Sequence, residues 1–122
     1  MLEAVYESWP LLLFALIIGH AVGDFALQGE FMASYKNRHS DMPFDEGRHP
    51  WGVILTAHAL IHAGLVWILT GIWYFAIAEF ILHWVIDFLK SERKFSFVAD
   101  QIFHVLCKVG YVAVLIYTAG WF

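Results

Sequence analysis

Acidic and histidine side chains recur four residues apart in four separate apolar stretches of the chain. Residues at this spacing point from the same face of an α-helix, about 40° apart around its axis. The pattern takes in five of the seven histidines and four of the eleven acidic residues. Its members are His20, Asp24, His58, His62, Glu79, His83, Asp87, Asp100 and His104. Imidazole nitrogens and carboxylate oxygens suit zinc, iron or manganese, so the pattern predicts a buried metal centre.

Nine candidates are more than the four ligands of one tetrahedral zinc ion. The pattern therefore predicts either one divalent ion whose ligands are oriented by further carboxylates, or two ions. Zinc is the first choice, with iron and manganese as alternatives. The predicted metal ligands are His20, Asp24, His58, His62, His83, Asp87, Asp100 and His104. The single cysteine, Cys107, lies off this face and is expected to be a small packed hydrophobe.

The composition indicates that these residues are carried by membrane helices. The 122 residues are 61% hydrophobic and 15% charged, whereas a soluble domain is about a quarter charged. At about 20 residues per span, the length allows three or four helices and no separate soluble domain. We predict an all-α fold, a four-helix transmembrane bundle formed by one integral-membrane domain over residues 1–122. The expected spans are residues 8–28, 50–69, 72–90 and 97–120.

Local signals support these boundaries. Pro10 and Pro50 suit the first turn of a helix, and Thr70-Gly71 predicts a tight turn between the second and third spans. Residues 29–49 are polar, and their first part is expected to lie along the membrane surface. Gly19 and Gly23 would let another helix approach closely beside His20.

The basic residues predict the orientation. Lys36, Arg38, Arg48, Lys90, Arg93 and Lys94 all fall in or beside the first and third loops. The positive-inside rule places both loops in the cytoplasm and both termini outside, in a bacterial inner membrane. An aromatic belt is expected at the outer boundary, formed by Trp9, Trp67, Trp73, Tyr74 and Trp121. Lys90, Arg93 and Lys94 are expected to be membrane anchors, although Lys90 could instead neutralise Glu79 or hold an anionic substrate. No basic stretch is dense enough for nucleic-acid binding.

Counting residues inward from the cytoplasmic ends, at 1.5 Å per residue, sorts the polar side chains by depth. Asp24, Asp87 and Asp100 lie about one turn in. A histidine from each span, His20, His58, His83 or His104, lies about two turns in. His62, Glu79 and Lys108 lie about three turns in, so Lys108 could neutralise Glu79 or hold an anionic substrate. Gln28 and Gln101 flank these residues, either as hydrogen-bond partners of the ligands or as ordinary helix residues.

Several strings also resemble a known family. His20-Ala-Val-Gly-Asp24-Phe-Ala-Leu-Gln28 followed by Lys36, His58-Ala-Leu-Ile-His62, His83-Trp-Val-Ile-Asp87 and Asp100-Gln-Ile-Phe-His104 are similar to motifs of an uncharacterised family of small bacterial and phage integral-membrane proteins. The resemblance covers about residues 11–106. A looser resemblance to bacterial membrane-bound metal-dependent hydrolases implies metal-assisted hydrolysis.

The leading functional hypothesis is a metal-dependent hydrolase that acts on an ester or phosphoester from the cytoplasmic side. The substrate would be a small molecule or a lipid. Glu79 is the predicted general base because burial makes a carboxylate more basic, and Asp24 and Lys108 complete the predicted catalytic set. One alternative is a metal-ion or proton transporter or a channel subunit. Another is a structural or regulatory protein whose buried polar network fixes helix register. A homodimer is compatible with each alternative.

Overall fold

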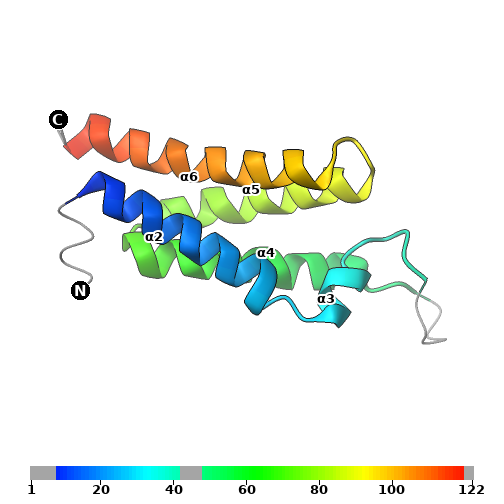
Figure 1. The fold of residues 1–122 in the computed structure, drawn as a ribbon. Helices are drawn as coiled ribbons and strands as arrows, with labels where there is room; N and C mark the ends of the chain where they lie inside the picture. Colours follow the sequence, from blue (N-terminus) through cyan, green and yellow to red (C-terminus); the bar gives the residue numbers. More distant parts are fainter. Residues whose placement is uncertain (1–7, 42–47, 120–122) are drawn as a thin grey trace.

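The chain forms long helices that lie side by side in a computed structural model, which describes residues 8–41 and 48–119 (Figure 1). Within these ranges the chain is helical and contains no strand, so the all-α prediction is confirmed. The elements are α2 (Trp9–Ala21), η1 (Val22–Ala26), α3 (Glu30–Tyr35), α4 (Trp51–Thr70), α5 (Trp73–Ser91) and α6 (Phe97–Ala119).

Four long helices run antiparallel to their neighbours along the chain. α2 packs against α4 and α6, and α5 packs against the same two helices from the opposite side. The start of α2, the α4–α5 turn and the end of α6 lie at one end of the bundle (Figure 1). We call this the terminal end. The segments that join η1 to α4 and α5 to α6 lie at the other end, which we call the loop end.

The helix boundaries follow from local chemistry. Pro10 lies in the first turn of α2, where its missing N–H costs nothing. α4 begins at Trp51, directly after Pro50 and one residue later than predicted. Gly71 ends α4 in the left-handed region, with φ 69° and its N–H bonded to the Trp67 carbonyl. At the start of α6, the Ser96 hydroxyl accepts a hydrogen bond from the Ala99 N–H.

Three stretches are long and apolar enough to cross a membrane, which indicates a membrane protein. They are Trp9–Ala26, Trp51–Thr70 and Phe97–Ala119. α5 has 19 residues but carries Glu79, Asp87 and Lys90, so it is less apolar than the other three. Trp9, Trp67, Trp73 and Tyr74 are exposed, as an aromatic belt requires, whereas Trp121 and the predicted end of the last span at residue 120 lie outside the described residues.

The first predicted span is not one uninterrupted α-helix. α2 ends at Ala21, and residues 22–26 form a π-helical turn in which the Leu27 N–H bonds to the Val22 carbonyl, five residues earlier. Single π turns are frequent at functional sites, and this one carries Asp24. Apolar periodicity in the sequence does not distinguish a π turn from an α turn, which is why the prediction missed it.

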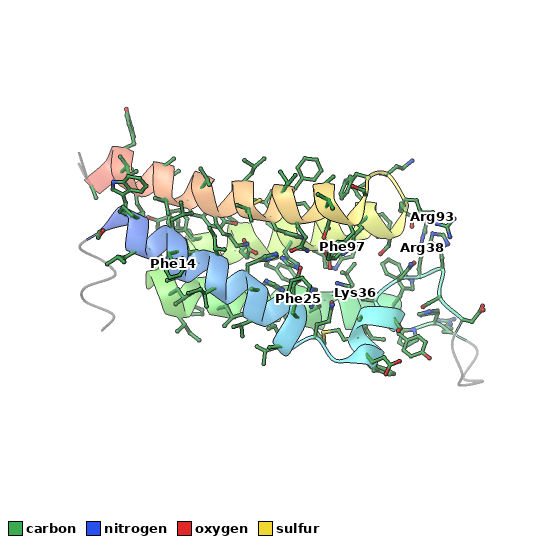
Figure 2. The ribbon with its side chains drawn as sticks, viewed as in Figure 1. Phe14, Phe25, Lys36, Arg38, Arg93 and Phe97 are labelled. Atoms are coloured by element: carbon green, nitrogen blue, oxygen red, sulfur yellow. The ribbon has the colours of Figure 1, made fainter. Side chains whose placement is uncertain are left out.

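The interior of the bundle is apolar in one half and polar in the other. The terminal half is filled by an apolar cluster of Leu12, Leu16, Val66, Phe75, Tyr111 and Val112. The loop half is filled by the ionisable residues that the sequence singled out. Many outward-facing side chains are apolar, such as Phe14 on α2 (Figure 2), as expected of a surface in contact with lipid.

Two glycines on α2 and η1 allow close approach to α4. A Cβ at Gly19 would lie 2.8 Å from Leu69 Cδ1, and a Cβ at Gly23 would lie 2.5 Å from His62 Cε1. The His62 ring therefore packs directly against the backbone of η1. Glycine at position 23 is thus required by the position of a predicted metal ligand.

We predict that Gly23→Ala destabilises the protein by about 1–3 kcal/mol, because the new methyl group displaces the His62 ring in a packed core. Thermal unfolding in detergent would measure this. Gly64→Ala in α4 is the matched control, since a Cβ there meets nothing within 4 Å. Equal stability of the two variants would contradict the close packing of η1 against His62.

Candidate metal centre

All nine residues of the four-residue pattern meet inside the loop half of the bundle. None of them is more than 7% exposed. α2 and η1 contribute His20 and Asp24, α4 contributes His58 and His62, α5 contributes Glu79, His83 and Asp87, and α6 contributes Asp100 and His104. We call this set the polar centre. Its convergence is the arrangement that the spacing predicted.

The histidine rings pack around that of His83. Its ring centroid lies 3.7 Å from that of His62, 4.1 Å from that of His104 and 4.9 Å from that of His58. Although His62 was expected about one turn deeper than His83, the two rings are stacked. Side chains tilt toward the N-terminus of their own helix, and α4 and α5 run in opposite directions. The two rings therefore lean toward each other and stack.

Asp24 on η1 lies in a group of four possible metal ligands with three histidines of α4 and α5. Each residue offers one ligand atom within 4.8 Å of the other three, and we call the group the Asp24 site: Asp24, His58, His62 and His83. Asp24 Oδ1 lies 3.0, 3.2 and 3.8 Å from the Nε2 atoms of His62, His58 and His83. The Nε2 atoms of His58 and His83 lie 3.1 Å apart. A tetrahedron with zinc–ligand bonds of about 2.0 Å has edges of about 3.3 Å, so these separations suit one zinc ion.

Three atoms of the Asp24 site are buried without a well-directed hydrogen bond among the described residues: Asp24 Oδ1, His62 Nε2 and His58 Nδ1. Asp24 Oδ1 and His62 Nε2 lie 3.0 Å apart, within hydrogen-bond distance but in an unfavourable direction. Leaving a buried polar atom unsatisfied costs about 1–3 kcal/mol. Both atoms are good metal ligands and both belong to the same four-atom group, so a cation among these atoms would satisfy them together.

Of the four remaining predicted ligands, His20 lies in a group with His83 and His104, and the other three form a second cluster that already contains cationic side chains. Asp87, Asp100 and His104 lie close enough to share an ion. However, Lys90 Nζ lies 3.2 Å from Asp100 Oδ2 and 3.7 Å from Asp87 Oδ1, and Lys36 Nζ donates to Asp87 Oδ2. Ammonium groups therefore neutralise this cluster without a second metal.

Lys36 is the main residue of the polar centre that the sequence reasoning missed. It was counted only among the basic residues of the first loop, yet it is only 5% exposed and directly follows α3 (Figure 2). α3 packs against α4 and directs the lysine to Asp87 on α5, 51 residues away. Lys90 was expected to be a membrane anchor or to neutralise a carboxylate of its own helix face, and it contacts Asp87 and Asp100. The signal that could have found Lys36 is the number of buried carboxylates, which exceeds the number of lysines on the predicted spans.

Glu79 lies at the inner edge of the polar centre, next to the apolar cluster. Its Oε1 accepts a hydrogen bond from Lys108 Nζ and lies 3.3 Å from His83 Nδ1, and its Oε2 accepts one from Tyr111. Lys108 is 1% exposed, so it neutralises Glu79, which is one of the two roles expected for it. A carboxylate on the far nitrogen of a ligating histidine fixes that ring. Glu79 occupies this position behind His83.

The two glutamines differ in what they contact. Gln101 Nε2 donates to Asp24 Oδ2 at 2.8 Å and to Asp100 Oδ2 at 3.2 Å. Its Oε1 lies 3.1 Å from His20 Nε2. Gln28 instead donates to the backbone carbonyl of Asp24. Gln101 therefore links η1 and α6 through side chains of the polar centre, and His20 is held by hydrogen bonding beside the Asp24 site.

The loop end is held together by exposed ion pairs. Arg38 donates two hydrogen bonds to Glu92, and His39 Nε2 lies 2.9 Å from the same carboxylate. The bonds from Arg38, assisted by His39, lower the pKa of Glu92 to about 2. His39 is half-exposed and outside the polar centre, as expected for a loop histidine. His49, the other loop histidine, contacts Ser40.

The comparisons with known proteins identify a family. The family described as "Protein of unknown function (DUF3307)" matches residues 12–121, which is nearly the whole chain. No curated protein and no solved structure matches the chain. The expectation of an uncharacterised family is therefore confirmed, and the polar centre lies within the matched region.

We predict that Lys36→Met destabilises the protein by about 3–5 kcal/mol, because it leaves the buried Asp87 carboxylate without this ammonium partner. Thermal or denaturant unfolding in detergent would measure the loss. Lys94→Met is the matched control, since Lys94 is an exposed lysine at the same end and should change stability by less than about 0.5 kcal/mol. Similar effects of the two substitutions would contradict a structural role for Lys36.

Proposed function

The chain belongs to the DUF3307 family, and we propose that it is a membrane-embedded metal-binding protein that acts as a metal-dependent hydrolase. The observation that carries the metal proposal is the buried group of ligand atoms from Asp24, His58, His62 and His83, which all lie within 4.8 Å of one another. Three atoms of these four residues lack a well-directed hydrogen bond among the described residues. A polar network that only fixed helix register would be expected to satisfy its own members.

In this proposal His58, His62 and His83 hold one zinc ion. Asp24 Oδ1 faces all three Nε2 atoms, so the fourth corner of the tetrahedron would lie at Asp24, filled by this oxygen or by a water beside it. Catalytic zinc sites commonly combine three protein ligands with a water molecule. Asp24 would either bind the ion directly or hold that water and accept its proton, and both roles use the same oxygen.

The charges inside the bundle favour one ion rather than two. The polar centre contains four carboxylates, and three lysines pair with three of them: Lys36 with Asp87, Lys90 with Asp100, and Lys108 with Glu79. Asp24 has no lysine or arginine partner among the described residues; its ionic contacts are with histidines. One divalent ion with a bound hydroxide would compensate this remaining charge, whereas a second ion would leave an excess of positive charge.

The chemistry expected of such a centre is hydrolysis. Zinc held by imidazole ligands lowers the pKa of a bound water to about 7, which supplies a nucleophile for an ester or phosphoester. The chain's own residues would position this water at the Asp24 corner. Because its oxygens contact Lys108, His83 and Tyr111, Glu79 would orient His83. The role predicted for Glu79 from the sequence, that of the general base, is separable from this orienting role by experiment.

We further propose that all four long helices span the membrane. Glu79, His83 and Asp87 of α5 are buried inside the bundle, so the surface that α5 would present to lipid is much less polar than its composition. The basic residues of the loop end, including Arg38, Arg48 and Arg93, would lie in the cytoplasm of a bacterial inner membrane, with both termini outside.

The transporter alternative is less well supported by the core. An ion path would have to continue through the terminal half of the bundle, which is filled by the apolar cluster around Leu12, Leu16 and Phe75. A packed apolar core excludes water and presents no ligands to an ion. Hydrolysis at a centre reached from one side needs no such path.

We predict that the purified protein binds about one equivalent of zinc per chain, the number that one tetrahedral site takes. His62→Ala and His83→Ala should lose the metal, because each removes a ligand. His39→Ala should retain it, since His39 is a loop histidine outside the centre. Elemental analysis after incubation with zinc, iron and manganese measures the content. No bound metal under any of these conditions would contradict the proposal.

We predict that chelation abolishes hydrolysis of chromogenic esters or phosphoesters and that zinc restores it. Glu79→Gln should weaken zinc affinity about 10–100-fold, as loss of a carboxylate that orients a ligating histidine does, and saturating zinc should recover the rate. A rate that stays low at saturating zinc would identify Glu79 as the base instead. Full activity in the chelated protein would contradict the hydrolase proposal.

A further inference from the structure

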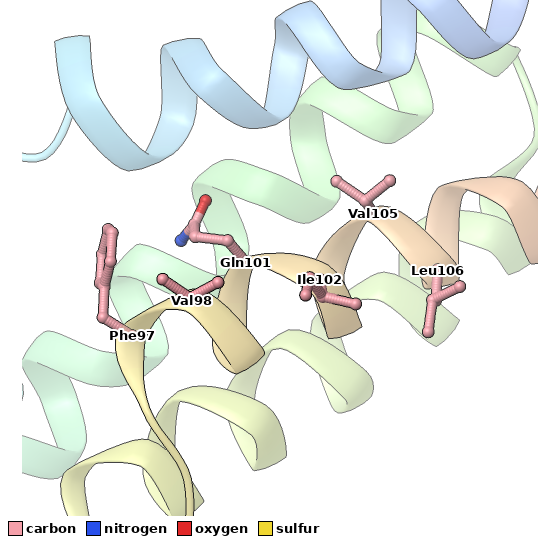
Figure 3. A pocket seen from close by; sticks show the side chains of 6 residues that line it. All are labelled: Phe97, Val98, Gln101, Ile102, Val105 and Leu106. Carbon is pink, nitrogen blue, oxygen red and sulfur yellow. The ribbon is translucent and has the colours of Figure 1, made fainter.

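The side-chain amide of Gln101 on α6 is held in one orientation by the polar centre. Its nitrogen carries two hydrogens, and it donates to Asp24 Oδ2 at 2.8 Å and to Asp100 Oδ2 at 3.2 Å. Its Oε1 lies 3.1 Å from His20 Nε2. The reversed amide would set its oxygen against two carboxylates. Figure 3 shows this side chain pointing from α6 toward the helix formed by α2 and η1.

The two carboxylate oxygens of Asp24 therefore have different surroundings. Oδ2 accepts the hydrogen bond from Gln101 and lies 3.4 Å from His20 Nε2. Oδ1 faces the three histidine nitrogens of the Asp24 site, at distances between 3.0 and 3.8 Å. A carboxylate can bind a metal ion through one oxygen or through both. The bond from Gln101 occupies Oδ2, which leaves Oδ1 as the oxygen that a metal ion would meet.

The number of oxygens that Asp24 offers affects which metal ion fits. Zinc suits four ligands in a tetrahedron, whereas manganese suits six ligands that are mostly oxygens. One oxygen of Asp24 and the three histidine nitrogens make four ligand atoms. A second oxygen from the same carboxylate would make five, which is a step toward the coordination that manganese prefers.

We propose that Gln101 is a positioning residue that restricts Asp24 to a one-oxygen contact with the metal ion. In the resting protein Asp24 Oδ1 is then the fourth ligand, and the Asp24 site prefers zinc to manganese. This inference rests on the metal site of the proposed function. It concerns the choice of metal, so it does not depend on whether the protein hydrolyses a substrate.

Cobalt(II) in place of zinc reports the number of ligands, because four-coordinate cobalt absorbs visible light much more strongly than six-coordinate cobalt. We expect strong visible bands from the full protein in detergent and weaker bands from Gln101→Met. Gln101→Asn retracts the amide by one methylene group and should weaken them too. Gln28→Met is the matched control, since Gln28 is also half-buried but donates to the Asp24 backbone carbonyl. It should keep the original spectrum.

Metal affinities separate positioning from a general loss of structure. Gln101→Met should weaken zinc binding about 10–100-fold, as the loss of a group that orients a metal ligand does. Manganese binding should not weaken, because Asp24 Oδ2 becomes available to the ion. The ratio of zinc to manganese affinity should therefore fall by about tenfold or more. Competition with a chromophoric chelator measures both affinities.

An unchanged cobalt spectrum in the Gln101 variants would overturn the positioning role and leave the metal site standing. Parallel losses of zinc and manganese affinity would do the same, because they indicate a structural role alone. A wild-type protein that binds neither zinc nor cobalt would overturn the proposed metal site, and this inference with it.

Discussion

The structure depends on the neutralisation of four carboxylates that are buried inside an apolar bundle. A buried carboxylate without a partner costs several kcal/mol, so each must be compensated before the helices can pack. Lysines from three different elements compensate Asp87, Asp100 and Glu79. Asp24 faces histidines and has no lysine or arginine partner among the described residues. Asp24 is therefore the carboxylate whose charge the proposed metal ion would compensate.

The need to neutralise buried carboxylates also explains the positions of α3, the π turn and Gly23. α3 has six residues and buries none of them, so packing alone does not explain its position. Its position directs Lys36 to Asp87, and Arg38 then fixes the following segment to Glu92. The π turn carries Asp24, and glycine at position 23 lets the His62 ring pack against it. The terminal half of the bundle is a conventional apolar core, which sets helix register where no charge has to be compensated.

The sequence predicted the all-helical fold and the convergence of nine residues because both depend on local periodicity. Spacing of four residues determines which side chains share a face, and antiparallel hairpins bring those faces together. Three features were not predicted from the sequence because they depend on contacts or backbone geometry that local periodicity does not encode. Lys36 acts across 51 residues, the π turn leaves apolar periodicity unchanged, and the stacking of His62 on His83 depends on opposite side-chain tilts in α4 and α5. The same local reasoning could not separate the Asp24 site from the cluster that lysines already neutralise.

The polar centre is least firmly closed on the side between η1 and α6. The apolar cluster fills the terminal end, and at the loop end Lys36 and the Arg38–Glu92 pair lie across the bundle. α4 and α5 pack extensively against each other along their lengths. Between η1 and α6, the described contacts near the centre are a glutamine that bonds to Asp24 and a pair of exposed phenylalanines. A neutral amide and two aromatic edges are easier to displace than a buried ion pair or a packed core. A substrate that reached Asp24 from this side would arrive from the lipid phase, so the proposed hydrolase would act on an amphiphile.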